Sequence, residues 1–178
     1  AAMTMEGLAE ALRQTPAALP VLTFHDSVTF HLNGQTVKVI HIRPAHTDGD
    51  AIVHFVEADA IHVGDAWFNG FYPFIDVAGG GDIDGMIAFL GELAAMAGEA
   101  TRIVPGHGPV GGRADVVEYR RVLRSIRERV AAAIAAGKSL EALIAEHPLA
   151  DLDPIYAGEV VGAADVLAMV HASLTRPR

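Results

Sequence analysis

The stretch IVPGHGP, residues 103–109, decides the fold that this sequence predicts. Its first two residues are apolar and β-branched, as in a short buried strand. The strand runs directly into a turn in which a glycine stands on either side of His107. Such glycines let the backbone bend sharply and leave space beside the imidazole ring. Because α/β proteins place their chemistry on short loops at strand ends, His107 is a candidate functional residue.

Two earlier stretches have the same character. PAHTDGD, residues 44–50, follows a predicted strand and places His46 in a polar turn, while VGD, residues 63–65, ends another predicted strand with Asp65 after a glycine. Each stretch alone is a weak signal, because Gly-His-Gly is usually only a turn and Gly-Asp usually a loop or a cap. Imidazole nitrogens and a carboxylate together suit zinc, and one carboxylate can bridge two ions with its two oxygens.

The other seven of the nine histidines carry weaker signals. A histidine within a strand-like run is more often partly buried and hydrogen-bonded than a metal ligand, which applies to His31, His41, His54 and His62. His147 precedes a proline at a predicted helix end, where it would cap the helix. Nothing around His25 or His171 indicates a function.

Hydrophobic periodicity predicts a mixture of strands and helices. Asn33-Gly34 joins two alternating runs and is a strong hairpin signal, because both residues accept a positive φ. The predicted strands are 28–32, 36–42, 51–56, 60–63 and 102–104, with a loop at 64–82. The predicted helices are 4–14, 83–96, 113–136, 139–146 and 162–174. This order indicates an α+β or layered α/β fold in a single domain over residues 1–178, with the sheet and its helices at about 20–130 and terminal helices at about 113–178.

Composition limits the classes of partner. The chain has 13 Lys and Arg against 22 Asp and Glu, a formal charge of −9, which argues against binding to a phosphate backbone. It has no cysteine, so disulfides and thiolate ligands are excluded. No apolar run is long enough to span a membrane, and no signal peptide is visible at the N-terminus. We therefore expect no nucleic acid and no membrane as partners.

In this order, the stretches around His46, Asp65 and His107 resemble the second half of the metallo-β-lactamase superfamily. The resemblance covers roughly residues 20–130 and implies one half of a four-layer αββα sandwich. It implies that His46 binds one zinc ion, that His107 binds a second, and that Asp65 bridges the two. Asp65 would also act in catalysis, by fixing the nucleophilic hydroxide. Thr47, Asp48 and Asp50 would shape the turn and support the ligand histidine.

The sequence departs from this family at one motif. His-x-His-x-Asp-His, which supplies the remaining zinc ligands in the family, does not occur here. A hydrolytic zinc ion needs about three protein ligands, so we expect this chain alone to be inactive and to bind zinc weakly or not at all. Half of a sandwich also exposes the inner face of its sheet. We therefore expect either a homodimer or a complex with the missing N-terminal half, and the sequence leaves the origin of that truncation open.

For the intact protein, the resemblance implies a zinc-dependent hydrolase with two ions and a small-molecule substrate. β-Lactam amide hydrolysis, with a role in antibiotic resistance, is the first expectation. An ester, thioester or lactone hydrolase of the same superfamily is the alternative, and a noncatalytic half-fold assembly module is a third. A β-lactamase would be periplasmic and the other enzymes cytoplasmic. The aromatic loop 67–74 would line the substrate cleft or, equally, pack onto the core.

Overall fold

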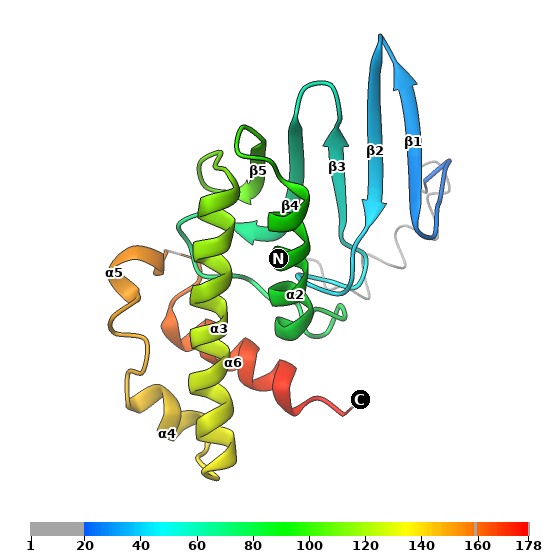
Figure 1. The fold of residues 1–178 in the computed structure, drawn as a ribbon. Coiled ribbons are helices and arrows are strands. Elements are labelled where there is room, and N and C mark those ends of the chain that lie inside the picture. Colours follow the sequence, from blue (N-terminus) through cyan, green and yellow to red (C-terminus); the bar gives the residue numbers. More distant parts are fainter. Residues whose placement is uncertain (1–19, 159, 178) are drawn as a thin grey trace.

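The computed structural model describes residues 20–158 and 160–177, and it combines one mixed sheet with a set of helices (Figure 1). The strands, in sheet order, are β1 (Ser27–Leu32), β2 (Gln35–His41), β3 (Ala51–Phe55), β4 (Ala60–Phe68) and β5 (Arg102–His107). The helices are α2 (Ile83–Met96), α3 (Arg113–Ala135), α4 (Leu140–Ala145), α5 (Asp153–Tyr156) and α6 (Ala163–Thr175). This α+β architecture confirms the predicted fold class. The helix predicted at 4–14 lies outside the described residues.

The hairpin predicted at Asn33-Gly34 joins β1 and β2. Asn33 has φ 52° and Gly34 has φ 76°, the left-handed geometry that a two-residue hairpin turn requires. The antiparallel register therefore starts directly at the turn, with Leu32 opposite Gln35. Three antiparallel pairings connect β1 to β4, and β5 adds in parallel to β4.

The strand predicted at 60–63 is longer than expected. β4 continues to Phe68, so Asp65 lies within a strand and not at its end. The pairing of β4 with β5 shifts register on both sides of Gly64, which has φ 54°. Such an irregularity bends a strand and changes where the next side chain points. The loop predicted at 64–82 therefore begins only after Phe68.

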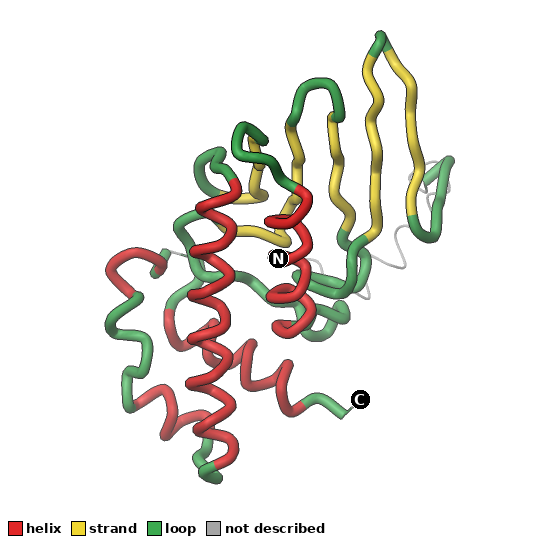
Figure 2. The backbone as a smooth tube through the Cα atoms, viewed as in Figure 1, coloured by secondary structure: helices red, strands yellow, loops and turns green. Residues whose placement is uncertain are grey.

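The core lies between one face of the sheet and the helices. Ile52, Ile61, Val63 and Ile103 share this face, and each is at most 1% exposed. Figure 2 shows the helices gathered on one side of the strands, and buried residues of α2, α3 and α6 complete the same cluster. We call this the covered face. It holds the strand ends that carry the candidate site in place.

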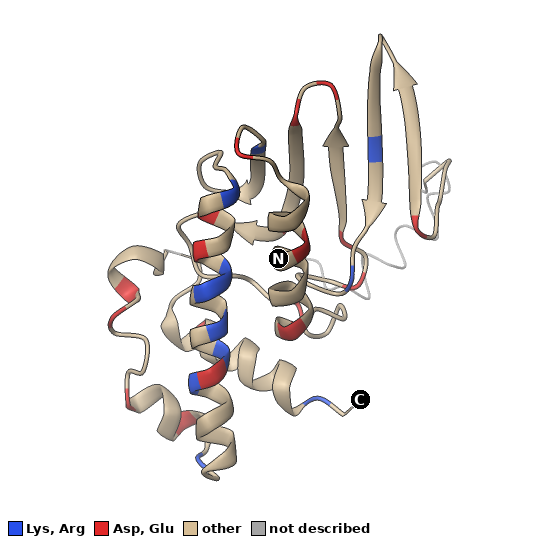
Figure 3. Ribbon diagram, viewed as in Figure 1, with Lys and Arg blue, Asp and Glu red and all other residues tan. Residues whose placement is uncertain are grey.

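The opposite face of the sheet is apolar but uncovered within the described ranges. Side chains that are opposite each other in the register lie on the same face. Two rows cross β1, β2 and β3 here, and they consist of Val28, Val39 and Val53, and of Phe30, Val37 and Phe55. None of the six is buried. We call this the open face, and Figure 3 shows that the strands carry few charges while α3 carries many.

None of the helices in the described part of the chain is long and apolar enough to cross a bilayer.

Candidate metal centre

His46 occupies a turn that a single carboxylate holds together. Asp50 Oδ2 accepts hydrogen bonds from the backbone N–H of His46 at 2.7 Å and of Thr47 at 3.0 Å. The Thr47 hydroxyl donates to the other oxygen of Asp50 at 2.8 Å. Hydrogen bonds to a charged acceptor are stronger than neutral ones. The backbone around His46 is therefore fixed by local polar groups.

The imidazole of His46 is oriented by the loop that follows β4. Its Nδ1 lies 2.8 Å from the carbonyl oxygen of Phe74. A carbonyl can only accept, so Nδ1 carries the proton and Nε2 keeps its lone pair. Nε2 faces Asp65 Oδ2 at 3.7 Å. This is the tautomer and direction that a metal-binding imidazole needs.

Backbone contacts join the His46 turn to the glycine-rich end of the same loop. The N–H of Asp76 donates to the carbonyl of His46 at 2.9 Å, and that of Asp48 donates to Gly79 at 3.0 Å. A Cβ at Gly81 would overlap the His46 carbonyl oxygen, so only glycine allows this approach. The run Gly79–Gly81 thus serves close packing of two loops.

Asp65 and His107 meet because of the glycine that precedes His107. A Cβ at Gly106 would overlap the Asp65 carboxylate, so the glycine leaves space for Asp65. His107 Nε2 lies 3.5 Å from Asp65 Oδ1. The His107 ring also stacks on Phe68, with centroids 5.1 Å apart and planes at 4°. The side chain of His107 is 61% exposed and that of His46 only 19%.

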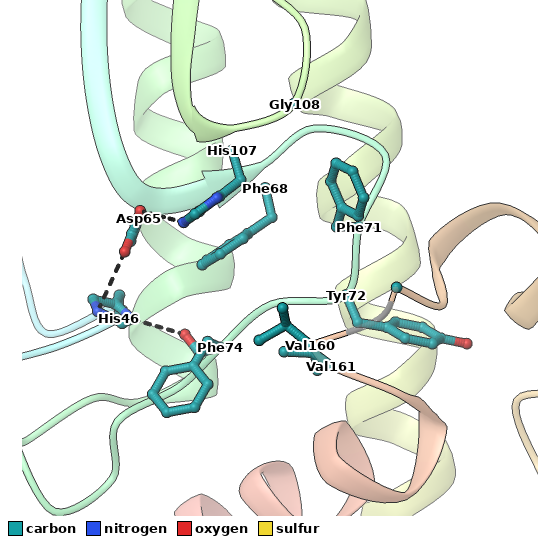
Figure 4. A pocket seen from close by; sticks show the side chains of 11 residues that line it. His46, Asp65, Phe68, Phe71, Tyr72, Phe74, His107, Gly108, Val160 and Val161 are labelled. Atoms are coloured by element: carbon teal, nitrogen blue, oxygen red, sulfur yellow. Dashed lines mark hydrogen bonds and ion pairs between the residues drawn. The ribbon is translucent and has the colours of Figure 1, made fainter. Parts of the chain in front are cut away.

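The three residues predicted as ligands therefore lie together, with one oxygen of Asp65 facing each histidine (Figure 4). Both nitrogen–oxygen distances exceed those of a hydrogen bond. Zinc bonds of about 2.0–2.2 Å in tetrahedral geometry place neighbouring ligands roughly 3.3–3.6 Å apart. The 3.5 Å distance lies within this range and the 3.7 Å distance just above it. The donor types suit zinc, and the metal and the ligand roles stay predictions.

Within the part of the chain that the structure describes, each histidine and the Asp65 oxygen that faces it make a pair of candidate donors. In the described ranges, no group of three or more His, Cys, Asp or Glu side chains is placed to hold one metal ion. Three ligands are the usual minimum for a hydrolytic zinc ion. The expectation that the site is incomplete rests on this count of candidate ligands.

The three residues line a cavity of about 660 Å³, and none of the other histidines in the described part of the chain does. The aromatic loop divides between the two predicted roles. Trp67 is fully buried and does not line the cavity, whereas Phe71 and Phe74 are 42% and 43% exposed and line it. Phe68 and Tyr72 are at most 6% exposed and contribute to both, because they pack into the core and also border the cavity.

Sequence reasoning missed three contributions to the cavity. The Phe74 carbonyl that orients His46 is a backbone atom, so residue type gives no signal for it. Val160 and Val161 line the cavity from the segment between α5 and α6, far along the chain from His107. No local pattern reports such a tertiary contact.

Comparisons with known proteins bear on the fold. No protein-family model matches the chain, and no curated protein matches it in sequence. Solved structures do match it. A metallo-β-lactamase from Pontibacter korlensis aligns with a TM-score of 0.54 and 20% identity, over 65% of this chain and 54% of its own. The DIM-1 metallo-β-lactamase aligns with a TM-score of 0.52 and 16% identity, over 65% and 53%.

A third neighbour covers more of the chain. A double mutant of the sec-alkylsulfatase Pisa1 from Pseudomonas sp. aligns with a TM-score of 0.67 and 14% identity, over 89% of this chain and 27% of its own. The chain thus spans about half the length of the two lactamases and about a quarter of the sulfatase. These likenesses show that it shares the metallo-β-lactamase fold over part of that fold's length.

Proposed function

We propose that this chain supplies part of the metal centre of a hydrolase with the metallo-β-lactamase fold. One observation carries the proposal: the two oxygens of Asp65 point to two different histidines, His46 at 3.7 Å and His107 at 3.5 Å. A structural aspartate needs no such arrangement. A carboxylate shared between two ions does.

The roles of the residues follow from this arrangement. His46 Nε2 and Asp65 Oδ2 would hold one zinc ion, and His107 Nε2 and Asp65 Oδ1 a second. Bound zinc lowers the pKa of its water toward neutrality and so provides hydroxide as the nucleophile. The Phe74 carbonyl keeps Nε2 of His46 unprotonated, and Asp50 keeps the His46 turn in place.

The missing ligands would come with a second layer on the open face. A sheet with apolar rows on both faces has to be covered on both, because contiguous apolar surface of this size associates in water. A second copy of the chain or an N-terminal half-domain would cover it. The half-domain would account for the site as well, since it would add ligands to those that the described residues supply.

β-Lactam amide hydrolysis is the first substrate class that we propose. The two lactamase neighbours support it through the fold. A sulfate ester is the second candidate, and the coverage of the sulfatase favours it. The sulfatase alignment leaves only 11% of this chain unmatched, which is about 20 residues. Because the terminal helices span residues 140–175, the alignment has to include part of them. The two lactamases each align with only 65% of this chain.

The test compares three substrates on the natural full-length gene product, loaded with zinc and set beside the isolated 178-residue chain. A chromogenic cephalosporin, a secondary alkyl sulfate and a phenyl ester separate the candidates. We expect turnover by the full-length product only. Asp65→Asn should lower it by at least about a hundredfold, because a neutral amide no longer bridges two cations.

Asp26→Asn is the matched control, since Asp26 is an exposed aspartate that does not line the cavity. We expect it to keep its activity within a few-fold. Equal loss in both variants, or zinc-independent turnover, would rule out the metal centre proposed here.

A further inference from the structure

Two phenylalanines of the loop after β4 are held outward over the candidate metal centre. Along residues 71–75 the pattern is exposed, buried, buried, exposed, buried. Phe71 and Phe74 are 42% and 43% exposed, while Tyr72 and Ile75 are 1% exposed. A loop that only filled space would turn its largest apolar side chains inward. Here the neighbours pack and the phenylalanines face the cavity (Figure 4).

The buried neighbours anchor this loop. The Tyr72 hydroxyl donates to Asp153 at 2.7 Å, and its N–H donates to the Tyr156 carbonyl at 2.8 Å. Burial, together with the hydrogen bond to Asp153, raises the pKa of Tyr72, so this hydroxyl stays a donor. Ile75 is fixed in the core, and its N–H points to the sulfur of Met169 at 3.2 Å. The outward position of the phenylalanines is therefore built into the loop.

The rest of the cavity wall is apolar too. Val161 is buried, and Val160, 90% exposed, stands beside it on the segment before α6. Among the described residues that line the cavity, the only ionisable side chains besides Tyr72 are His46, Asp65 and His107, and there is no Lys or Arg. A charged group away from the metal would lose hydration without finding a partner. A hydrocarbon group would remove apolar surface from water.

We propose that Phe71, Phe74, Val160 and Val161 form a binding subsite for an uncharged hydrocarbon chain. This inference rests on the proposed function, because it places the reacting group of the substrate at Asp65. It deepens that function by naming the substrate class: a hydrolysable ester or amide whose non-reacting part is an aliphatic chain. A cavity of about 660 Å³ is of the size of a small-molecule site.

The experiment measures binding of straight-chain alkanols to the 178-residue chain without metal. Butanol, hexanol and octanol are neutral and cannot be hydrolysed, and their dissociation constants are obtained by calorimetry. We expect affinity to rise about fourfold for each added CH₂ group. Phe71→Ala and Phe74→Ala should each weaken octanol binding at least about fivefold, because each removes a wall of the subsite. Phe74→Leu, which keeps an apolar wall, should retain most of the affinity for octanol.

Phe55→Ala is the matched control. Phe55 is 38% exposed, close to the value for the two subsite phenylalanines, but it lies on the open face. We expect it to leave octanol binding unchanged. If octanol binds no more tightly than butanol, or if Phe55→Ala weakens binding as much as Phe74→Ala, the subsite is ruled out.

The subsite and the proposed function can be disproved independently of each other. Alkanol binding needs no metal, so an inactive full-length product would leave it unchanged. Conversely, a zinc-dependent hydrolase of polar substrates would be active and bind no alkanol.

Discussion

The two faces of the sheet have similar composition and opposite surroundings. On the covered face, Ile61 and Val63 of β4 are 1% exposed beneath the helices. On the open face, Val39 and Val53 form a row of the same residue types, and neither is buried. Burial of apolar area is the dominant favourable contribution to folding. The covered face therefore stabilises the fold, whereas the open face contributes less among the described residues and would contribute more beneath a second layer.

The candidate site shows the same asymmetry. Asp65 and His46 are positioned by hydrogen bonds and close backbone contacts within this chain. Among the described residues, however, each of the two proposed metal positions has two donors, whereas a hydrolytic zinc ion usually takes at least three from the protein. The second layer that we propose would complete both the open face and the candidate site.

The largest expected effect contrasts the faces directly. Ile61→Ala should lower the free energy of unfolding by about 2–5 kcal/mol, because it leaves a cavity in the core. Val53→Ala on the open face should cost no more than about 1.5 kcal/mol, since its side chain is only partly buried. Urea denaturation of both variants at low protein concentration measures the difference. Equal losses would contradict the assignment of the two faces.

The second effect concerns association. If a second copy covers the open face, Val39→Asp should weaken dimerisation by at least about a hundredfold, because a carboxylate would be buried without a partner. Lys38→Asp introduces the same residue on the other side of β2 and should leave dimerisation nearly unchanged. Sedimentation equilibrium measures both. A dimer that survives Val39→Asp would have to form elsewhere.

A smaller effect is expected in the His46 turn. Asp50→Ala removes the acceptor of three hydrogen bonds, and we expect a loss of about 1–3 kcal/mol in unfolding free energy. Asp48→Ala, in the same turn, removes none of these three bonds and should cost under about 0.5 kcal/mol. Thermal denaturation of both variants compares them. If both lose equally, Asp50 does not hold the turn.

The smallest effect depends on pH. The Arg129 guanidinium donates to Asp151 and lowers the pKa of that carboxyl below its ordinary value of 3.8. The pair therefore stabilises the fold above this pH, and the stabilisation is lost as the pH falls through the lowered pKa. Asp151→Asn should be slightly less stable than the wild type at pH 7, with the difference vanishing in strong acid. Parallel denaturation curves across pH test this, and a constant difference would contradict it.

Much of the fold could be predicted from the sequence, because local signals determine it. Asn33-Gly34 indicated the hairpin, and apolar periodicity indicated the long helices α2 and α3. The end of β4 was missed, because the bulge at Gly64 depends on pairing with β5, whose residues come about 40 positions later. The helix α5 was missed because four residues are too few for a periodic pattern.

The candidate site was predictable in its residue types and not in its surroundings. His46, Asp65 and His107 stood out because each lies beside a glycine or a turn near a strand end, and the structure brings them together. The Phe74 carbonyl and the outward-facing Phe71 could not be predicted, because a backbone acceptor and a rotated loop leave no trace in residue order.

Zinc content of the isolated chain tests the central claim most directly. The 178-residue chain is saturated with zinc, passed through gel filtration and analysed for metal by mass spectrometry. Two donors per ion should not retain zinc, so we predict far less than one tightly bound ion per chain. Two zinc ions retained per chain would contradict the account, because the site would then be complete without a second layer.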